Sequence, residues 1–170
     1  KAPRLGGAKN FKVSDFGLVP MHVTTWGPLV AICPVNATEA QAPRRPQEQW
    51  SDLSSQLEEM AWDELVFAER RVYEMDCNWK VYVDNYLDGG YHVSVLHRDL
   101  STGLELDSYE TTLGDRMVLQ KVEGVGDARI GRTALYAWLY PGFMINRYGP
   151  MMDTNFVVPL SPTRCRVVFD

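Results

Sequence analysis

Two of the three histidines in the chain lie close together. His92 and His97 are five positions apart and follow the glycine pair at 89–90. Imidazole is the commonest metal ligand in proteins, and two histidines with one carboxylate form the set that holds non-heme Fe(II) while leaving positions open for oxygen and substrate. The residue types therefore predict a metal site; the alternative is a pair of hydrogen-bonded polar groups near a helix end. Oxygen donors are close in the sequence, at Asp84, Asn85, Asp88 and Asp99.

The spacing of the two histidines constrains the backbone between them. On a regular helix, residues five apart differ by about 140° in direction and do not share a face. A distorted helix is therefore required if both imidazoles are to bind one ion. A π-bulge would bring residues five apart nearly into line, and the glycine pair supplies the backbone freedom for such an irregularity.

The elements around this stretch follow from hydrophobic periodicity. Residues 78–88 have a helical period that ends at the glycines, and residues 48–62 predict an amphipathic helix. Strands are predicted at 17–35 (two, broken at Trp26-Gly27-Pro28), 64–77 (one or two), 106–113, 116–124, 133–149 and 154–170, the last a hairpin that turns at Leu-Ser-Pro-Thr. The Ala- and Pro-rich residues 36–47 predict a mobile loop. Helices on one side of a meandering antiparallel sheet give an α+β domain.

Composition excludes several classes of function. The 170 residues carry a net charge of −5, which argues against nucleic-acid binding. No apolar run approaches the roughly 20 residues of a membrane-spanning helix, and we expect no membrane partner. Cys33, Cys77 and Cys165 are too widely spaced for a zinc knuckle or a disulfide framework, which suits a reducing compartment. The chain starts and stops without a cap or tail, so we expect a segment that is incomplete at both ends.

Longer stretches carry a resemblance to a known family. The stretches NWK, DNYLDGGYHV and LH, then LYPGFMINRYGPMMDTN and CRVVFD, resemble in the same order the catalytic domain of Rieske-type non-heme iron oxygenase alpha subunits, among them choline monooxygenase and its relatives. The strands VSDFGLVP and WGPLVAI near the start extend the likeness over almost the whole chain. The family implies a helix-grip-like domain, in which a curved antiparallel sheet packs against a long helix with the substrate pocket between them.

The resemblance implies roles for four residues. His92 and His97 match the two imidazole ligands of a mononuclear Fe(II). Asn85 matches an asparagine that lies near the metal without a firm bond to it. Asp88 resembles the carboxylate that bridges toward the iron–sulfur cluster of a neighbouring subunit, although many members have one residue fewer between this acid and the first histidine. A structural acid in a turn before two glycines is the alternative for Asp88.

The resemblance also implies parts that this chain lacks. A Rieske [2Fe-2S] cluster needs paired Cys and His residues, which we expect upstream. The third iron ligand is an Asp that we expect on a helix downstream, because Asp153 and Asp170 are candidates by residue type only. The family implies a homotrimer, a reductase or ferredoxin as electron donor, and C–H hydroxylation of a small substrate. We expect a cytoplasmic protein, or a stromal one if the source is a plant, and an isolated segment that is inactive.

The sequence says less about the substrate. A choline-like quaternary ammonium compound would need aromatic faces, and Asn146 and Arg147 are polar residues in an apolar run, for which the surface is the favoured interpretation. The alternative function is a non-catalytic helix-grip module that binds a small ligand; a zinc hydrolase is disfavoured because no His-Glu-x-x-His motif is present. The candidate aromatic residues are Tyr86, Tyr91, Trp138, Tyr140, Phe143 and Tyr148, and the methionines that could line an apolar pocket are Met144, Met151 and Met152.

Overall fold

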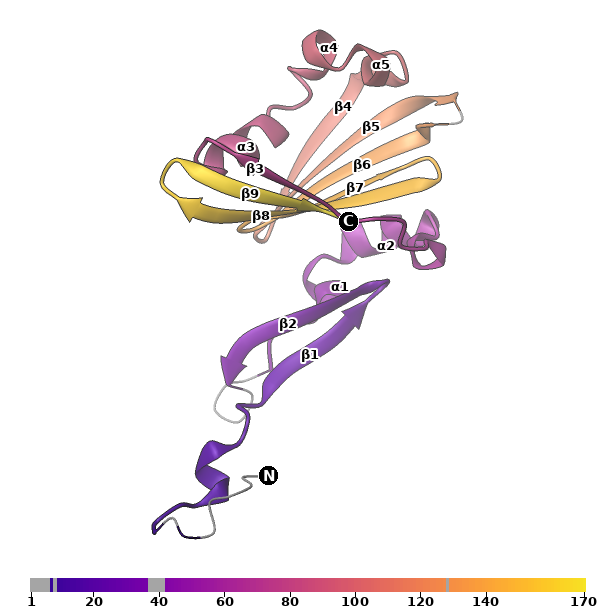
Figure 1. The fold of residues 1–170 in the computed structure, drawn as a ribbon. Coiled ribbons are helices and arrows are strands. Elements are labelled where there is room, and N and C mark those ends of the chain that lie inside the picture. Colours follow the sequence, from indigo (N-terminus) through magenta and orange to yellow (C-terminus); the bar gives the residue numbers. More distant parts are fainter. Residues whose placement is uncertain (1–6, 8, 37–41, 128) are drawn as a thin grey trace.

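A seven-stranded antiparallel sheet forms the centre of the molecule (Figure 1). The computed structural model describes residues 7, 9–36, 42–127 and 129–170. In the sheet the strand order is β3-β9-β8-β7-β6-β5-β4. The elements in chain order are η1 (Val13–Phe16), β1 (Met21–Trp26), β2 (Leu29–Asn36), α1 (Pro46–Gln49), α2 (Ser51–Glu59), η2 (Trp62–Glu64), β3 (Arg71–Met75), α3 (Trp79–Tyr86), α4 (Val93–Leu96), α5 (Arg98–Ser101), β4 (Leu104–Gly114), β5 (Met117–Asp127), β6 (Gly131–Leu139), β7 (Phe143–Tyr148), β8 (Met151–Ser161) and β9 (Arg164–Phe169).

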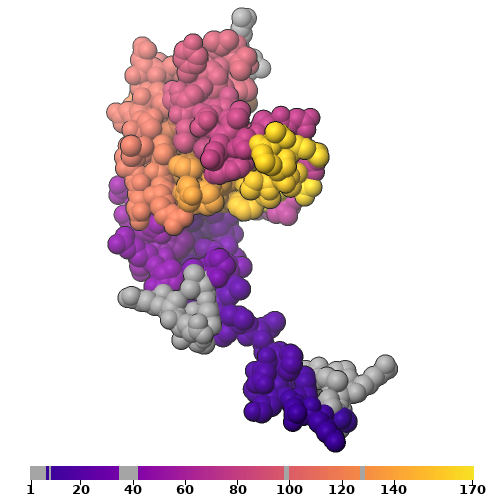
Figure 2. Space-filling view, turned by 90° about the vertical axis from the view of Figure 1, so that its left-hand side faces the viewer, coloured from indigo at the N-terminus to yellow at the C-terminus, as the bar shows by residue number. Residues whose placement is uncertain are grey.

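Strands β1 and β2 form a separate antiparallel hairpin. Its turn is at Gly27–Pro28, where the sequence predicts the break between two strands, and Trp26 pairs with Leu29 across it. The turn end of the hairpin is buried because Trp26, at 3% exposure, enters the core. The other end points away from the sheet, so η1 lies far from the body of the molecule (Figure 2).

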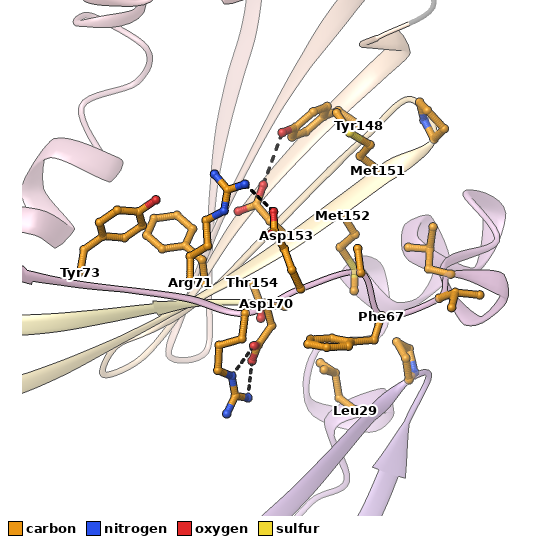
Figure 3. A pocket seen from close by; sticks show the side chains of 18 of the residues that line it. Leu29, Phe67, Arg71, Tyr73, Tyr148, Met151, Met152, Asp153, Thr154 and Asp170 are labelled. Carbon is orange, nitrogen blue, oxygen red and sulfur yellow. Dashed lines mark hydrogen bonds and ion pairs between the residues drawn. The ribbon is translucent and has the colours of Figure 1, made fainter.

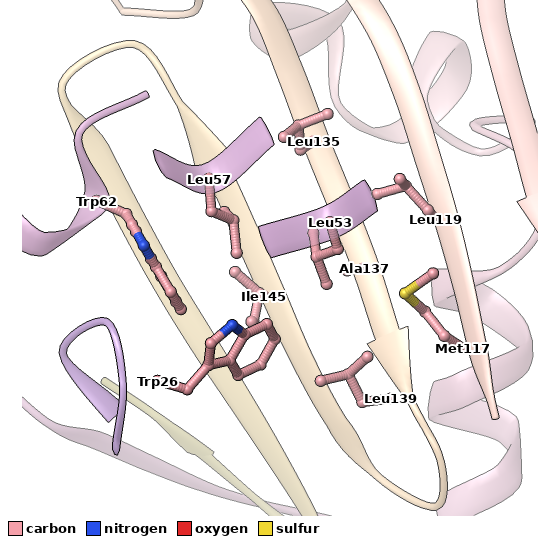
Figure 4. Packing of buried hydrophobic residues seen from close by; sticks show 10 residues of the cluster. All are labelled: Trp26, Leu53, Leu57, Trp62, Met117, Leu119, Leu135, Ala137, Leu139 and Ile145. Carbon is pink, nitrogen blue, oxygen red and sulfur yellow. The ribbon is translucent and has the colours of Figure 1, made fainter. Parts of the chain in front are cut away.

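Helix α2 covers one face of the sheet (Figure 4). Leu53 and Leu57 are fully buried and point at the apolar residues of β5, β6 and β7, while Trp62 closes the cluster beside Trp26. Burying a leucine side chain stabilises the fold by about 1.5–3 kcal/mol. This apolar layer covers one face of the sheet, and the row of polar residues described below lies on the opposite face.

Gly27 should be intolerant of any side chain. Its φ is +51°, and a Cβ on it would overlap atoms of the Trp62 ring. We expect Gly27→Ala to lower the free energy of unfolding by about 2–3 kcal/mol, measured by thermal unfolding. Gly17→Ala is the matched control, because Gly17 has φ −71° and its nearest neighbouring atom would be 3.9 Å from the new Cβ. Equal unfolding temperatures for the two variants would contradict this account.

Helices α3, α4 and α5 lie on the other face of the sheet (Figure 1). Val83 of α3 packs with Met144, Val157 and Val167 of β7, β8 and β9. Val93 of α4 packs with residues of β4, β5 and β6. The stretch that contains the histidines is therefore held over the sheet at both of its ends.

Several sequence predictions need correction. Of the described helices the longest, α2, has nine residues, so the structure does not show the expected long helix. The predicted strand 133–149 is two strands, because the chain turns at Tyr140-Pro141-Gly142. Within 64–77 only Arg71–Met75 joins a ladder, with β9. In the predicted loop 36–47, Asn36 ends β2 and α1 begins at Pro46, while residues 37–41 lie outside the described part of the chain.

The predicted strand VSDFGLVP is wrong, because residues Val13–Phe16 form the short helix η1 and β1 begins only at Met21. The remaining strand predictions are confirmed, including the final hairpin, in which β8 and β9 pair around a turn at residues 162–163. Cys77 Sγ and Cys165 Sγ lie 3.9 Å apart, and the three cysteines are free thiols. No helix among the described residues is long and apolar enough to cross a membrane.

Candidate metal centre

The two histidines lie at the two ends of the four-residue helix α4. His92 is the residue before its first turn and His97 the residue after its last. Their ring centroids are 5.2 Å apart and the rings are nearly perpendicular, at 79°. The structure thus brings together the two imidazoles that the sequence singles out, with the His92 side chain 17% exposed.

No π-bulge is needed for this approach. The amide groups of Leu96 and His97 donate to the carbonyl groups of His92 and Val93, which is ordinary α-helical bonding. The backbone leaves the helical conformation at His97 itself, where φ is −119° and ψ is 59°. The predicted distortion is therefore present in another form: the helix ends, and its C-cap residue turns back toward the N-cap residue.

The glycine pair places Asp88 against His92. Gly89 and Gly90 have φ of +70° and +80°, a conformation that side chains disfavour. This turn returns the chain so that Asp88 Oδ1 accepts from the Gly90 amide, at 3.0 Å, and Oδ2 from the His92 amide, at 3.2 Å. The extra residue between the acid and the first histidine is thereby accommodated.

Asp88 also contacts the His92 ring. Asp88 Oδ2 and His92 Nδ1 are 2.6 Å apart. A carboxylate accepts here, so Nδ1 carries the proton and the lone pair of Nε2 is left for a metal. A carboxylate that orients a ligating imidazole in this way is the usual outer partner of a metal-bound histidine. The donor set therefore fits two of the ligands of a metal ion.

The other predicted donors are not part of this group. The Asn85 and Asp84 side chains are exposed on α3, and among the described residues no hydrogen bond joins the Asn85 amide to either imidazole. The side chain of Asp99 lies outside the described part of the chain. Asp170 is bound to Arg70 at 2.6 Å and 2.8 Å. Within the described ranges no three His, Cys, Asp or Glu side chains converge on a point.

A row of polar residues crosses the sheet beneath these helices. Gln120, Tyr136, Asn146 and Asp153 are successive cross-strand partners on β5, β6, β7 and β8. Gln120 donates to the Tyr86 carbonyl at 3.0 Å and accepts from Tyr109 Oη at 3.0 Å. Gln120 thereby joins the polar row to the last residue of α3.

The row is connected to the histidine region near the C-terminal end of α3. The Tyr109 ring packs on Gly90, and the Asp88 carboxylate contributes to the raised pKa of Tyr109, about 12, after burial. Tyr86 Oη donates to Asn146 Oδ1 at 2.8 Å. Burial raises the pKa of Tyr86 well above its usual value, and the charge on Asp153 adds to this. Both phenols are therefore neutral donors at physiological pH.

A cavity of about 1,070 Å³ lies beside Asp153, where the first residues of β8 have no strand on their outer side (Figure 3). Tyr148 and Asp153 point into it from the sheet, and Tyr82 borders it from α3.

The aromatic residues that the sequence offers as candidates lie in different environments. Tyr148 lines the cavity and Tyr86 is half-buried, whereas Tyr91 and Tyr140 are exposed. Trp138 packs with α3, and Phe143 packs in the core on the α2 side.

The sequence did not single out Asn146 and Arg147 as buried. Asn146 is 9% exposed and lies in the polar row, whereas Arg147 is 5% exposed on the α2 face, so the favoured surface interpretation is wrong for both. Arg147 donates to the carbonyl groups of Met60 and Gly149. Two adjacent polar residues in an otherwise apolar strand could have indicated burial. A central strand of a sheet that is covered on both faces buries the side chains on both of its sides.

Comparison with known proteins decides the family. The model of the family described as ring hydroxylating alpha subunit (catalytic domain) matches residues 62–170. The chain belongs to this family. The resemblance seen in the sequence is thereby confirmed, and the antiparallel sheet with its short helices is an arrangement found in Rieske oxygenase catalytic domains.

Curated relatives are chloroplastic choline monooxygenases. Over the whole of this chain, the Arabidopsis thaliana protein is 46% identical and the Spinacia oleracea protein 36% identical. These alignments cover 43% and 40% of the relatives, so the chain spans less than half of their length. Crystal structures of the quaternary ammonium Rieske monooxygenase CntA share the fold. The complex with an inhibitor has a TM-score of 0.81 at 21% identity, and that with L-carnitine 0.76 at 22%; each covers the whole chain and 46% of CntA.

Proposed function

We propose that this chain is the iron-binding part of a Rieske-type monooxygenase that hydroxylates a choline-like quaternary ammonium compound. The observation that carries the proposal is the arrangement of Asp88, His92 and His97: two imidazoles 5.2 Å apart, one of them oriented by a carboxylate at 2.6 Å. Family membership and the choline monooxygenase relatives support it.

His92 and His97 would hold a mononuclear Fe(II), with a third ligand from an Asp that we place on a helix downstream. The same helix would complete the helix-grip arrangement over the sheet. When bound, the iron activates oxygen for insertion into a substrate C–H bond. Asp88 holds the proton on His92 Nδ1 and fixes the ring, while Tyr86 and Gln120 fix the end of α3 on the sheet. Asn85 stays the predicted polar neighbour of the metal.

The reaction balances with oxygen and two electrons. One oxygen atom enters the C–H bond next to the alcohol of choline, and the other leaves as water with two protons. The resulting geminal diol loses water and becomes betaine aldehyde. We place the source of the electrons in a Rieske [2Fe-2S] domain upstream, supplied by a reductase or ferredoxin.

We propose a homotrimer in which Asp88 faces the cluster of a neighbouring subunit. One CntA structure is described as giving insight into inter-subunit electron transfer. In this chain the β1–β2 hairpin carries exposed apolar side chains. Val23, Val30 and Ile32 are each more than 60% exposed, and Val23 pairs with Ile32 across the two strands. Exposed apolar groups that cluster in this way are typical of contact surfaces. The relatives are named chloroplastic, and we place this protein in the stroma.

The full-length protein tests the proposal. With a ferredoxin-type donor, oxygen and choline, we expect betaine aldehyde that carries label from ¹⁸O₂ until exchange with water, and iron in excess of the cluster. The isolated 170-residue segment should form no product. Absence of both product and excess iron from the full-length protein would leave the binding-module interpretation.

A further inference from the structure

Asp153 is a partly buried carboxylate whose partners are all neutral. Asn146 Nδ2 donates to its Oδ1 at 2.7 Å, Asn155 Nδ2 donates to the same oxygen at 2.8 Å, and Tyr148 Oη approaches Oδ2 at 3.4 Å. Among the described residues no Lys, Arg or His forms an ion pair with it. A partly desolvated charge without a counterion costs free energy, and a bound cation would offset that cost.

The other charges of the cavity are already paired. Arg70 binds Asp170, and Arg71 binds Glu69. These four side chains therefore pair with one another, and Asp153 is the one charged residue lining the cavity that forms no ion pair among the described residues. A cationic ligand that carries no carboxylate fits this arrangement, because both arginines that line the cavity are already paired with an acid.

Aromatic rings surround the carboxylate. Tyr82 and Tyr148 line the cavity with Asp153, and Figure 3 shows Tyr148 beside the carboxylate. Behind them the Tyr136 ring lies 6.5 Å from the Tyr148 ring, and its hydroxyl is buried without a hydrogen-bond partner. Burial raises the pKa of these three phenols and the Asp153 charge raises it further, while the positive charge of Arg129 offsets part of this for Tyr136 and Tyr148. Their rings are therefore uncharged and available to a cation.

This combination distinguishes classes of cation. A quaternary ammonium group has no N–H to donate, so it needs negative potential and aromatic faces rather than free acceptors. Asp153 Oδ1 is already occupied by two amide donors, which suits a ligand that forms no hydrogen bond. A primary ammonium would instead need acceptors for its three N–H groups, and of the two carboxylate oxygens only Oδ2, which Tyr148 Oη approaches at 3.4 Å, is still largely open.

We propose that Asp153, with the rings of Tyr82 and Tyr148, binds the quaternary ammonium group of the substrate. This assignment rests on the proposed function and names the subsite that would select its substrate class. The position agrees with the chemistry. Asp153 lies on the sheet face that α3 covers, and hydrogen bonds lead from it through Asn146 to Tyr86, six residues before His92. The subsite is thereby fixed to the helix that leads to the histidines.

The test compares choline with 3,3-dimethylbutan-1-ol, its neutral carbon isostere. Binding to the iron-free full-length protein is measured by titration calorimetry, so that the result is independent of turnover. We expect the unaltered protein to favour choline, and Asp153→Asn to weaken choline binding by about tenfold or more while leaving the isostere unchanged. Asp63→Asn, the same charge change on the exposed η2 turn, should alter neither.

A second pair of variants covers a folding defect in Asp153→Asn. Tyr148→Phe keeps the ring and should retain choline binding, whereas Tyr148→Leu should weaken it several-fold. Equal loss for choline and the isostere, or no loss in Asp153→Asn and Tyr148→Leu, would overturn the subsite. Choline binding that depends on Asp153 in a protein without turnover would refute the proposed function alone. Turnover with binding that is indifferent to Asp153 would refute the subsite alone.

Discussion

Replacement of His92 by alanine in the full-length protein is expected to abolish binding of the mononuclear iron and to lower betaine aldehyde formation by more than about 100-fold. Removing even an outer partner of a metal ligand typically costs 10–100-fold, and His92 would be a ligand itself, with Nε2 left open by the bond from Nδ1 to Asp88. Iron bound per chain and product formed per minute are the two measurements. His97→Ala should behave in the same way, because its ring is the partner at 5.2 Å.

His22→Ala is the control for this experiment. His22 is the third histidine of the chain and lies in β1, in the hairpin on the other side of the molecule. The visible absorbance of the upstream cluster should be unchanged in all three variants, which separates loss of the mononuclear iron from loss of the cluster. If His92→Ala retained its excess iron and its turnover, the ligand assignment would have to be abandoned.

Local sequence patterns predicted most of the fold because they act over short distances. Gly27–Pro28 turns a hairpin, and Ser161-Pro162-Thr163 turns another, wherever the rest of the chain lies. The helix from Asn78 was predicted from its periodicity, and the Asn78 side chain caps it by accepting from the Lys80 amide at 3.0 Å. The described part of the chain does not show the expected long helix: α3 ends before Gly89 and Gly90, whose φ angles are positive, and α4 ends where the backbone leaves the helical conformation at His97.

The candidate site was predictable only in part, for a physical reason. His92, His97 and Asp88 are close in sequence, so their types and spacing could be assessed together. The proposed role of Asp153 depends on its contact with Asn146 on the neighbouring strand, and that pairing depends on the register of β7 and β8. Hydrophobic periodicity says which residues face inward on a strand, but it does not say which residue lies opposite on the next strand.

Strand β7 contributes buried side chains to both faces of the sheet. On β7, Ile145 and Arg147 point toward α2, while Met144 and Asn146 point toward α3. Both faces are covered, so both polar residues need internal partners. Arg147 binds the carbonyl at the end of α2, and Asn146 joins the row beneath α3. Alternation of polar and apolar residues along the strand would not by itself predict that both of these polar side chains are buried.

Asp88→Asn in the full-length protein is expected to reduce product formation by about 10–100-fold while most of the mononuclear iron stays bound. An asparagine has one acceptor where Asp88 has two, and Asp88 accepts from the Gly90 amide, the His92 amide and His92 Nδ1. One side of the new amide would present N–H groups to the N–H groups of His92. We expect this repulsion to release the imidazole from its fixed orientation. The substitution also removes the negative charge that we propose lies between cluster and iron.

A second measurement separates a structural role for Asp88 from its proposed role between two redox groups. After the cluster has been reduced, its return to the oxidised absorbance with oxygen and choline present should slow in Asp88→Asn by a factor similar to that for product formation. Asp84→Asn, the same change four residues earlier on the exposed side of α3, should leave that rate unchanged. Reoxidation at the normal rate in Asp88→Asn would show that the carboxylate only orients His92. In that case the bond at 2.6 Å would be the whole of its contribution, and the route between subunits would have to pass through another group.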